Sequence, residues 1–163
     1  MRTDSTVAAY LEHMIDAFYD DQKTLRELSG YATDDELEGL YALGYNLFTY
    51  GRYEEAATVF GDLTAYAPYM PHYWRALGAV NQQLGEYAEA IAAYDMAVVQ
   101  DDTDVVSRVY RSESQMLAGD LAEGLEGLAA VVDPGAVFAN QVAWVARAHL
   151  LMDMLGDASA DGQ

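Results

Sequence analysis

Apolar and polar positions follow a helical period along most of the chain. In residues 34–132 apolar side chains recur every three or four positions, the spacing of helices that bury one face. The first such stretch carries Leu37, Leu40, Leu43 and Leu47. Thr33 followed by Glu36 forms a capping-box sequence, which predicts that this helix begins there. Pro68 and Pro71 predict the end of one helix and the start of another, because proline cannot continue a helix but suits its first turn.

A glycine recurs every 34 residues, at Gly51, Gly85 and Gly119, and each begins a similar short sequence motif. This is the period of the tetratricopeptide repeat, a pair of antiparallel helices that stacks on its neighbours. The pattern therefore predicts an all-α chain: a tetratricopeptide-repeat superhelix of three helix pairs, with an N-terminal helical segment and a C-terminal capping helix.

The predicted domain organisation follows from this period. The expected parts are an N-terminal helical segment at 1–33, repeats at about 37–70, 71–104 and 105–133, a C-terminal helix at 134–156 and a frayed tail at 157–163. The third repeat is degenerate, since Arg108, Arg111 and Ser112 replace its large apolar residue and Leu-Gly pair. The last helix is expected to cover the exposed end of the stack, as terminal repeats require.

Composition narrows the classes of function. With 8 Lys and Arg against 27 Asp and Glu, the net charge of −19 opposes binding to nucleic acid or anionic lipid. The absence of cysteine excludes disulfides, thiol catalysis and thiolate metal sites. No signal-peptide pattern opens the chain, and the apolar run 142–155 is too short to span a bilayer, so we expect a soluble cytoplasmic protein.

No catalytic chemistry is predicted. His13, His72 and His149 lie in separate elements without ligand spacing, and acidic residues gather at helix starts, where they favour the helix dipole. No phosphate loop, nucleophile motif or metal-binding motif occurs. We expect no metal, no cofactor and no enzymatic activity.

The first helix of each repeat should line a concave groove. Residues four positions apart on these helices share the inner face. The expected lining is Tyr41, Tyr45 and Phe48 in repeat one, Arg75, Ala79 and Gln82 in repeat two, and Val109, Glu113 and Met116 in repeat three. Its aromatic end favours an extended apolar peptide. Alternatively, some of these tyrosines serve only packing within the molecule.

These residues resemble a known family. The run 40–56 (LYALGYNLFTYGRYEEA), the segment 63–66 (LTAY) before Tyr73-Trp74, and 85–91 (GEYAEAI) are similar to the class II, tetratricopeptide-repeat translocator chaperones of type III secretion. The resemblance covers about residues 34–132. One departure is Asp20-Asp21-Gln22, where the family often has glycines.

The resemblance implies a chaperone of the bacterial cytoplasm that binds hydrophobic translocator proteins before export. An extended translocator segment with proline and leucine anchors would lie in the groove. By position, its pockets would be formed by Tyr41, Tyr45, Phe48, Tyr66 and Tyr94. The resemblance also implies a possible homodimer through the N-terminal segment, at Val7, Leu11, Met14, Ile15 and Phe18.

A second hypothesis remains open at this stage. The same groove would serve a tetratricopeptide scaffold or adaptor in another assembly, such as a pilus or cell-envelope complex. Translocator genes beside the gene for this chain would favour the chaperone.

Overall fold

A computed structural model describes residues 33–136 and 141–160 of the chain. Within these residues it contains helices and no strands. The helices are α3 (Asp34–Thr49), α4 (Tyr53–Tyr66), α5 (Pro71–Leu84), α6 (Tyr87–Gln100), α7 (Val105–Ala118), α8 (Leu121–Val132) and α9 (Val142–Ala160). The predicted capping box is present: the Thr33 hydroxyl accepts from the Glu36 amide, and the Glu36 carboxylate accepts from the Thr33 amide.

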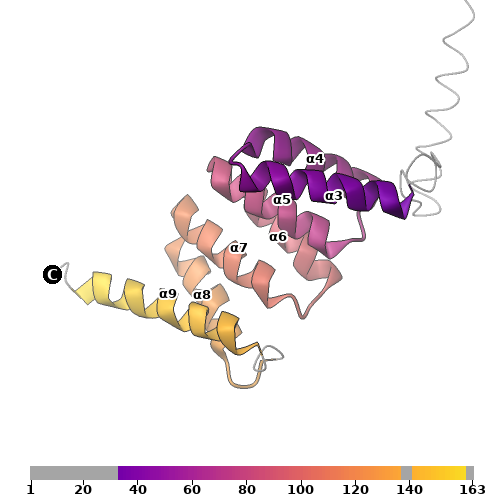
Figure 1. Cartoon of the computed structure of the whole chain (residues 1–163). Coiled ribbons are helices and arrows are strands. Elements are labelled where there is room, and N and C mark those ends of the chain that lie inside the picture. Colours follow the sequence, from indigo (N-terminus) through magenta and orange to yellow (C-terminus); the bar gives the residue numbers. More distant parts are fainter. Residues whose placement is uncertain (1–32, 137–140, 161–163) are drawn as a thin grey trace, which may run out of the picture.

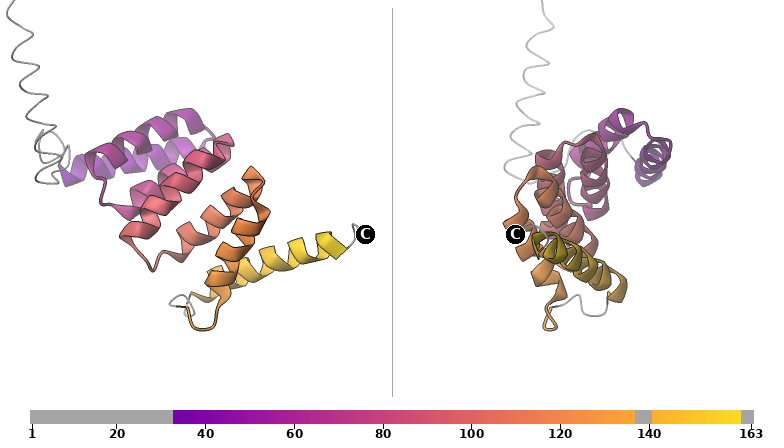
Figure 2. Two further views of the ribbon diagram at one scale, coloured as in Figure 1. Left: turned by 180° about the vertical axis from the view of Figure 1, so that it is seen from behind. Right: turned by 90° about the vertical axis from the view of Figure 1, so that its left-hand side faces the viewer.

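The helices stack as three antiparallel pairs, α3/α4, α5/α6 and α7/α8 (Figure 1). Each helix packs against the next along the chain, while α3 also contacts α5 and α5 contacts α7. The first helices of successive repeats are therefore neighbours on one side of the stack. Helix α9 packs on α8 and α7 and lies across the end of the stack (Figure 2). The predicted all-α tetratricopeptide fold is confirmed.

The repeated glycines turn the chain between the helices of each pair. Gly51, Gly85 and Gly119 have φ angles of 74°, 80° and 103°, in the left-handed region that side chains disfavour. The residue after each glycine donates its amide to a carbonyl in the last turn of the preceding helix, for example Glu86 to Asn81 at 2.9 Å. This is the Schellman geometry of a helix C-terminus. The 34-residue period thus marks a backbone requirement.

Inside the first two pairs, an aromatic ring lies directly on a glycine of the partner helix. A Cβ added at Gly44 would stand 2.8 Å from the Phe60 ring, and one at Gly78 would stand 2.7 Å from the Tyr94 ring. Phe60 and Tyr94 are almost completely buried. Only glycine permits these rings to close against the backbone, so each ring sets how closely its helix pair packs.

The third pair achieves the same closeness with a different distribution of small residues. Ser112 stands on α7 where the earlier repeats have glycine, and the glycines move to α8. A Cβ at Gly124 would meet the Ser112 carbonyl oxygen at 2.7 Å, and one at Gly127 would collide with the Ser112 hydroxyl. In the degenerate repeat the glycines that allow close packing therefore lie on the second helix of the pair instead of the first.

The C-terminal helix differs from its predicted bounds. It begins at Val142 and continues to Ala160, beyond the point where a frayed tail was expected. Ala158 and Ala160 are strong helix formers, so small size alone was a poor signal for fraying there. The predicted dimerisation residues lie outside the described residues: Val7, Leu11, Met14, Ile15 and Phe18.

We predict that Gly78→Ala destabilises the protein, because its methyl group would overlap the buried Tyr94 ring. Overpacking of this kind costs about 1–3 kcal/mol in the free energy of unfolding. The matched control is Gly39→Ala, since an added Cβ at Gly39 in α3 has no neighbour within 4 Å. Alanine there should raise stability by about 0.5–1 kcal/mol through its higher helix propensity. Urea denaturation measures both, and equal effects of the two substitutions would contradict the ring-on-glycine account.

Candidate functional site

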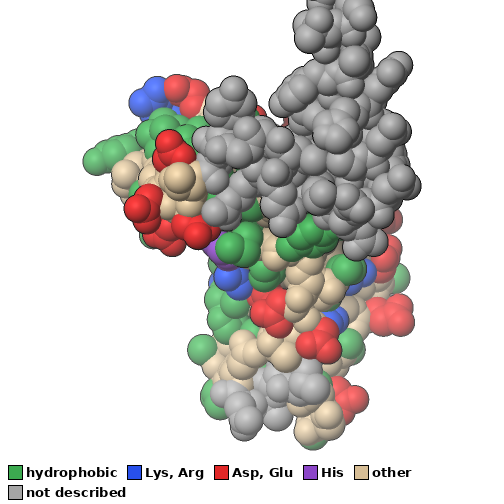
Figure 3. All heavy atoms as spheres, turned by 90° about the vertical axis from the view of Figure 1, so that its right-hand side faces the viewer, with side chains coloured by type: hydrophobic (Ala, Val, Ile, Leu, Met, Phe, Trp, Pro, Cys, Tyr) green, Lys and Arg blue, Asp and Glu red, His purple; other side chains and the backbone are tan. Residues whose placement is uncertain are grey.

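An apolar pocket lies between the first helices of repeats one and two. Its volume is about 140 Å³. It is lined by Tyr41, Tyr45 and Phe48 of α3, Phe60 of α4, and His72, Arg75, Ala76 and Ala79 of α5. On one face of the molecule, hydrophobic side chains gather between groups of acidic ones (Figure 3). The structure thus brings together five of the residues predicted to line the groove: Tyr41, Tyr45, Phe48, Arg75 and Ala79.

The two leading tyrosines differ in their surroundings. The Tyr41 ring is half-buried, and its centroid lies 5.7 Å from those of Phe60 and Tyr73. Tyr45 is 60% exposed and stands at the pocket rim. Tyr41 therefore helps to build the pocket wall, whereas Tyr45 presents most of its surface to any occupant. The alternative that a predicted groove tyrosine serves only packing within the molecule therefore fits Tyr41 in part, but it does not fit Tyr45.

Three lining residues were missed as site residues in the sequence. Phe60 is almost completely buried, yet its ring also lines the pocket. His72 precedes Arg75 by one helical turn and therefore shares its face, a spacing that could have identified it. Ala76 carried no signal, because a small residue is informative only once the neighbouring helix is placed.

The only cation in the pocket lining is fixed by a buried carboxylate. Arg75 Nη1 donates to Asp104 Oδ1 at 3.0 Å, and the Asp104 side chain is 2% exposed. Asp104 also accepts from the Ser107 amide at 3.0 Å and from the Ser107 hydroxyl at 2.6 Å, which caps α7. This network joins the first helix of repeat two to the start of repeat three. It orients the guanidinium of Arg75, whose side chain is 38% exposed and lines the pocket.

His72 adds a ring that favours the neutral state. Its centroid lies 5.3 Å from Tyr41 in an edge-on arrangement. Partial burial lowers the pKa of His72 below 6.5, the charge of Arg75 lowers it further, and Glu38 opposes both. A neutral imidazole keeps this wall of the pocket compatible with apolar side chains at neutral pH.

Two of the predicted groove residues need correction, because they are fully buried. Tyr94 has no exposed surface, its ring covers Gly78, and its hydroxyl donates to Gln82 Oε1 at 3.1 Å. Burial also raises the pKa of Tyr94, so the hydroxyl remains a donor. Val109 likewise has no exposed surface and lies in the apolar cluster shared by α7, α8 and α9. Neither has surface to offer a ligand.

Three further predicted groove residues lie outside the pocket lining. Gln82 is half-buried and accepts the Tyr94 hydrogen bond. Tyr66 packs on the core cluster of the first two repeats. Met116 packs against α8, where its Cγ occupies the space that a Gly124 side chain would need. The pocket lining thus includes predicted residues of repeats one and two but none of repeat three. That the lining residues contact a client stays a prediction.

A larger hollow of about 280 Å³ is a poorer candidate. It is lined by Arg108, Arg111, Ser112, Glu123, Glu126, Gly127 and Ala130. Charges of both signs line it without any large apolar side chain, and Arg111 lies 3.1 Å from Asp95 in an ion pair. Ligand pockets are mostly apolar with a few placed polar groups, which describes the smaller pocket.

Comparisons with known proteins agree with this fold. The tetratricopeptide-repeat family matches residues 41–105. Over 96 residues the chain is 33% identical to "Low calcium response locus protein H" of Yersinia pestis, and this alignment covers 59% of this chain and 57% of that protein. It is 32% identical over 94 residues to "Chaperone protein SicA" of Salmonella dublin, covering 58% of this chain and 56% of that protein. The match thus spans little more than half the length of these relatives.

Solved structures extend the similarity over more of the chain. The type III secretion translocator chaperone SycD of Yersinia enterocolitica aligns with a TM-score of 0.72 and 28% identity, covering 81% of this chain and 98% of SycD. PcrH, solved with the chaperone binding region of PopD, gives a TM-score of 0.72 and 27% identity over 79% of this chain and 97% of PcrH. The chain is a homologue of the type III secretion translocator chaperones.

A structure of a type III secretion complex from Aeromonas hydrophila aligns with still more of this chain. Its TM-score is 0.78 with 27% identity, over 92% of this chain and 99% of that one. The resemblance inferred from the aromatic and glycine motifs is confirmed. Among the described residues, no helix has the length and apolar character that a membrane span requires.

We predict that Asp104→Ala lowers the free energy of unfolding of this protein by about 2 kcal/mol. The substitution removes the cap of α7 and leaves Arg75 without its buried partner. Thermal unfolding followed by circular dichroism measures the loss. The control is Glu55→Ala, which breaks the exposed pair with Arg52 and should change stability far less. An Asp104→Ala variant as stable as the wild type would show that the network does not join the repeats.

Proposed function

We propose that this chain is a secretion chaperone of the bacterial cytoplasm that binds hydrophobic type III translocator proteins. An extended translocator segment seats an apolar side chain in the pocket between α3 and α5. The observation that carries the proposal is this accessible apolar pocket, walled by Tyr41, Tyr45 and Phe48. Related chaperones have been solved with the chaperone binding region of PopD and with a peptide of the translocator YopD.

The pocket suits an aliphatic anchor such as leucine or proline. It is a small pocket of about 140 Å³ whose lining is mainly aromatic and alanine side chains. Complete burial of a leucine-sized side chain is worth roughly 1.5–3 kcal/mol. The Arg75 guanidinium at the edge can donate to a backbone carbonyl of the bound segment while Asp104 holds it in place. Tyr45 supplies a hydroxyl that can do the same.

The action of such a chaperone needs no chemistry. A translocator carries membrane-seeking segments that would aggregate before export. Holding one segment in extended form and covering apolar surface keeps the client soluble and competent for export. The chaperone homologues and the repeat fold both favour a non-catalytic protein, and release would fall to the export machinery.

Self-association is part of the proposal. The chaperone SycD of Yersinia enterocolitica has been solved as an alternative dimer. We propose that this chain also forms a homodimer through its N-terminal segment, as the family resemblance implies. The large negative charge would keep separate assemblies apart by repulsion.

We predict that Tyr45→Ala weakens binding of the PopD chaperone-binding region by about tenfold, equivalent to about 1.4 kcal/mol. Tyr45 is the most exposed aromatic of the pocket, so its loss removes contact area with little effect on packing. Isothermal titration calorimetry measures the affinity, and circular dichroism checks the helix content.

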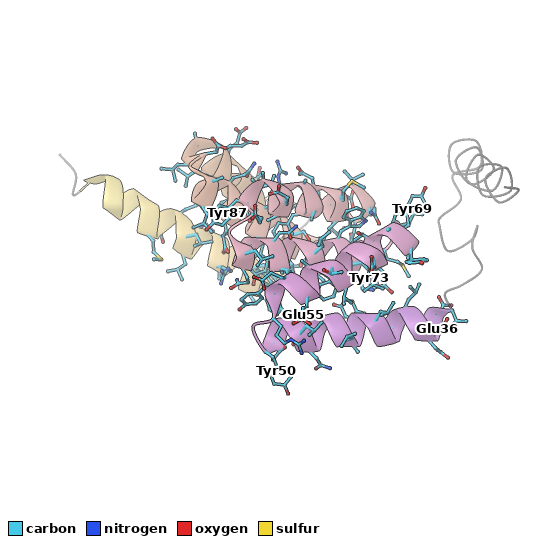
Figure 4. All side chains as sticks on the ribbon, turned by 90° about the horizontal axis from the view of Figure 1, so that it is seen from above. Glu36, Tyr50, Glu55, Tyr69, Tyr73 and Tyr87 are labelled. Carbon is cyan, nitrogen blue, oxygen red and sulfur yellow. The ribbon has the colours of Figure 1, made fainter. Side chains whose placement is uncertain are left out.

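The matched control is Tyr50→Ala, at the residue that follows the C-terminal end of the same helix. Tyr50 is 80% exposed and projects away from the stack, at the opposite end of α3 from Glu36 (Figure 4). Its removal should leave the affinity unchanged. Equal affinities of the two variants would refute the pocket assignment. Failure of the wild type to bind this peptide, and to co-purify with hydrophobic proteins encoded beside it, would refute the proposed function.

A further inference from the structure

The concave face is open in repeats one and two but covered in repeat three. Glu113 occupies the position in α7 that Tyr45 and Ala79, both pocket residues, occupy in α3 and α5. Tyr45 is 60% exposed, whereas the Glu113 side chain is only 12% exposed. The difference arises because a side chain of α9 lies over Glu113.

Arg147 of α9 makes this contact. Its Nη2 lies 2.6 Å from Glu113 Oε1, and its Nε donates to the same oxygen at 2.8 Å. The guanidinium also stacks over the Tyr110 ring, 5.4 Å from the ring centroid. Arg147 thus occupies the groove-facing side of α7 with a charge-assisted contact and a cation–π contact.

Trp144 and Gln141 extend the cover toward the start of α7. The Trp144 ring meets the Tyr110 ring edge-on, with centroids 5.5 Å apart. Gln141 Nε2 donates at 2.9 Å to the carbonyl of Thr103, in the turn that precedes α7. The first turns of α9 therefore lie along α7 from its beginning to Glu113.

Helix α9 is held there by apolar packing. Ala148 is fully buried against the cluster of Val105, Val109, Leu128 and Val131, and Trp144, Val145 and Leu151 pack on the same cluster. Removing α9 would expose this cluster and leave the Glu113 carboxylate without its partner. A ligand of repeat three would have to offset both costs.

We propose that α9 is the end-stop of the binding groove, so that a client segment occupies α3 and α5 but not α7. Trp144 and Arg147 are then specificity-determining residues that fix the length of the bound segment. Packed helices lie about 8–10 Å apart and an extended chain advances about 3.3 Å per residue, so a segment crossing α3 and α5 needs only about six residues. This inference rests on the proposed function for its ligand, but the covering of repeat three can be tested without any ligand.

The first experiment measures access to equivalent positions. Because the chain has no cysteine, single-cysteine variants report one site each. Ala79→Cys and Glu113→Cys are treated with a thiol reagent under native conditions. We expect Cys at 113 to react about tenfold more slowly than Cys at 79, because α9 must open locally to expose it. Adding Arg147→Ala, or Trp144→Ala as a second variant, should bring the two rates together.

The second experiment measures the length of the bound segment with nested peptides from the chaperone-binding region of PopD. In the wild type, affinity should stop rising once the peptide spans α3 and α5. With Arg147→Ala it should continue to rise with length. The control is Arg52→Ala, whose exposed pair with Glu55 lies away from the groove and should leave the plateau unchanged.

The outcomes separate the two proposals. Equal labelling rates at positions 79 and 113 in the otherwise unchanged protein would overturn the end-stop, whatever the peptides do. Slow labelling at 113 without peptide binding would support the cover over repeat three and count against the proposed function. Slow labelling at 113 together with wild-type affinity that keeps rising with length would overturn the end-stop as the limit of the bound segment.

Discussion

The packing of each helix pair depends on small residues that let the two helices approach closely, and in the first two repeats an aromatic ring rests on a glycine. Phe60 on Gly44 and Tyr94 on Gly78 each bring two helices so close that no Cβ fits between ring and backbone. This contact fixes the packing within a pair, and the left-handed glycine turns fix its connection. The glycine turn recurs every 34 residues in all three pairs, and the ring-on-glycine contact recurs in the first two, which therefore pack with the same geometry. The first helices then lie side by side, and equivalent positions on them share one concave face.

The third repeat shows what happens when this constraint is met differently. Ser112 replaces the glycine, while Gly124 and Gly127 provide the space from the other helix. The buried side of α7 accordingly mixes small polar residues (Ser107, Ser112 and Ser114) with Val105 and Val109. Arg147 of α9 covers another part of the same helix, through Glu113 and Tyr110. The degenerate repeat therefore differs from the first two both in its internal packing and in being covered by α9.

The sequence predicted the local features well because each has a local cause. The capping box at Thr33, the glycine turns and the prolines mark helix ends through backbone chemistry alone. The helical period was sufficient to identify five residues that line the pocket: Tyr41, Tyr45, Phe48, Arg75 and Ala79. The same reasoning failed at Val109, because α9, which lies outside the repeat, packs on the cluster that contains this residue. It failed at Tyr94 because the ring-on-glycine contact, and not a ligand, uses that side chain.

The same reasoning explains how an acidic chain keeps an apolar binding pocket. The chain has a net charge of −19, and among the residues with described side chains most carboxylates are exposed, whereas Asp104 is buried and hydrogen-bonded. Arg75, the only cation in the pocket lining, is paired by Asp104, and His72 is biased toward neutrality. In the proposed function the pocket selects an anchor by its shape and hydrophobicity, while the surrounding charge opposes association between separate assemblies. Closing repeat three with α9 limits the exposed apolar groove to the part that a client segment would cover, which separates binding from non-specific aggregation.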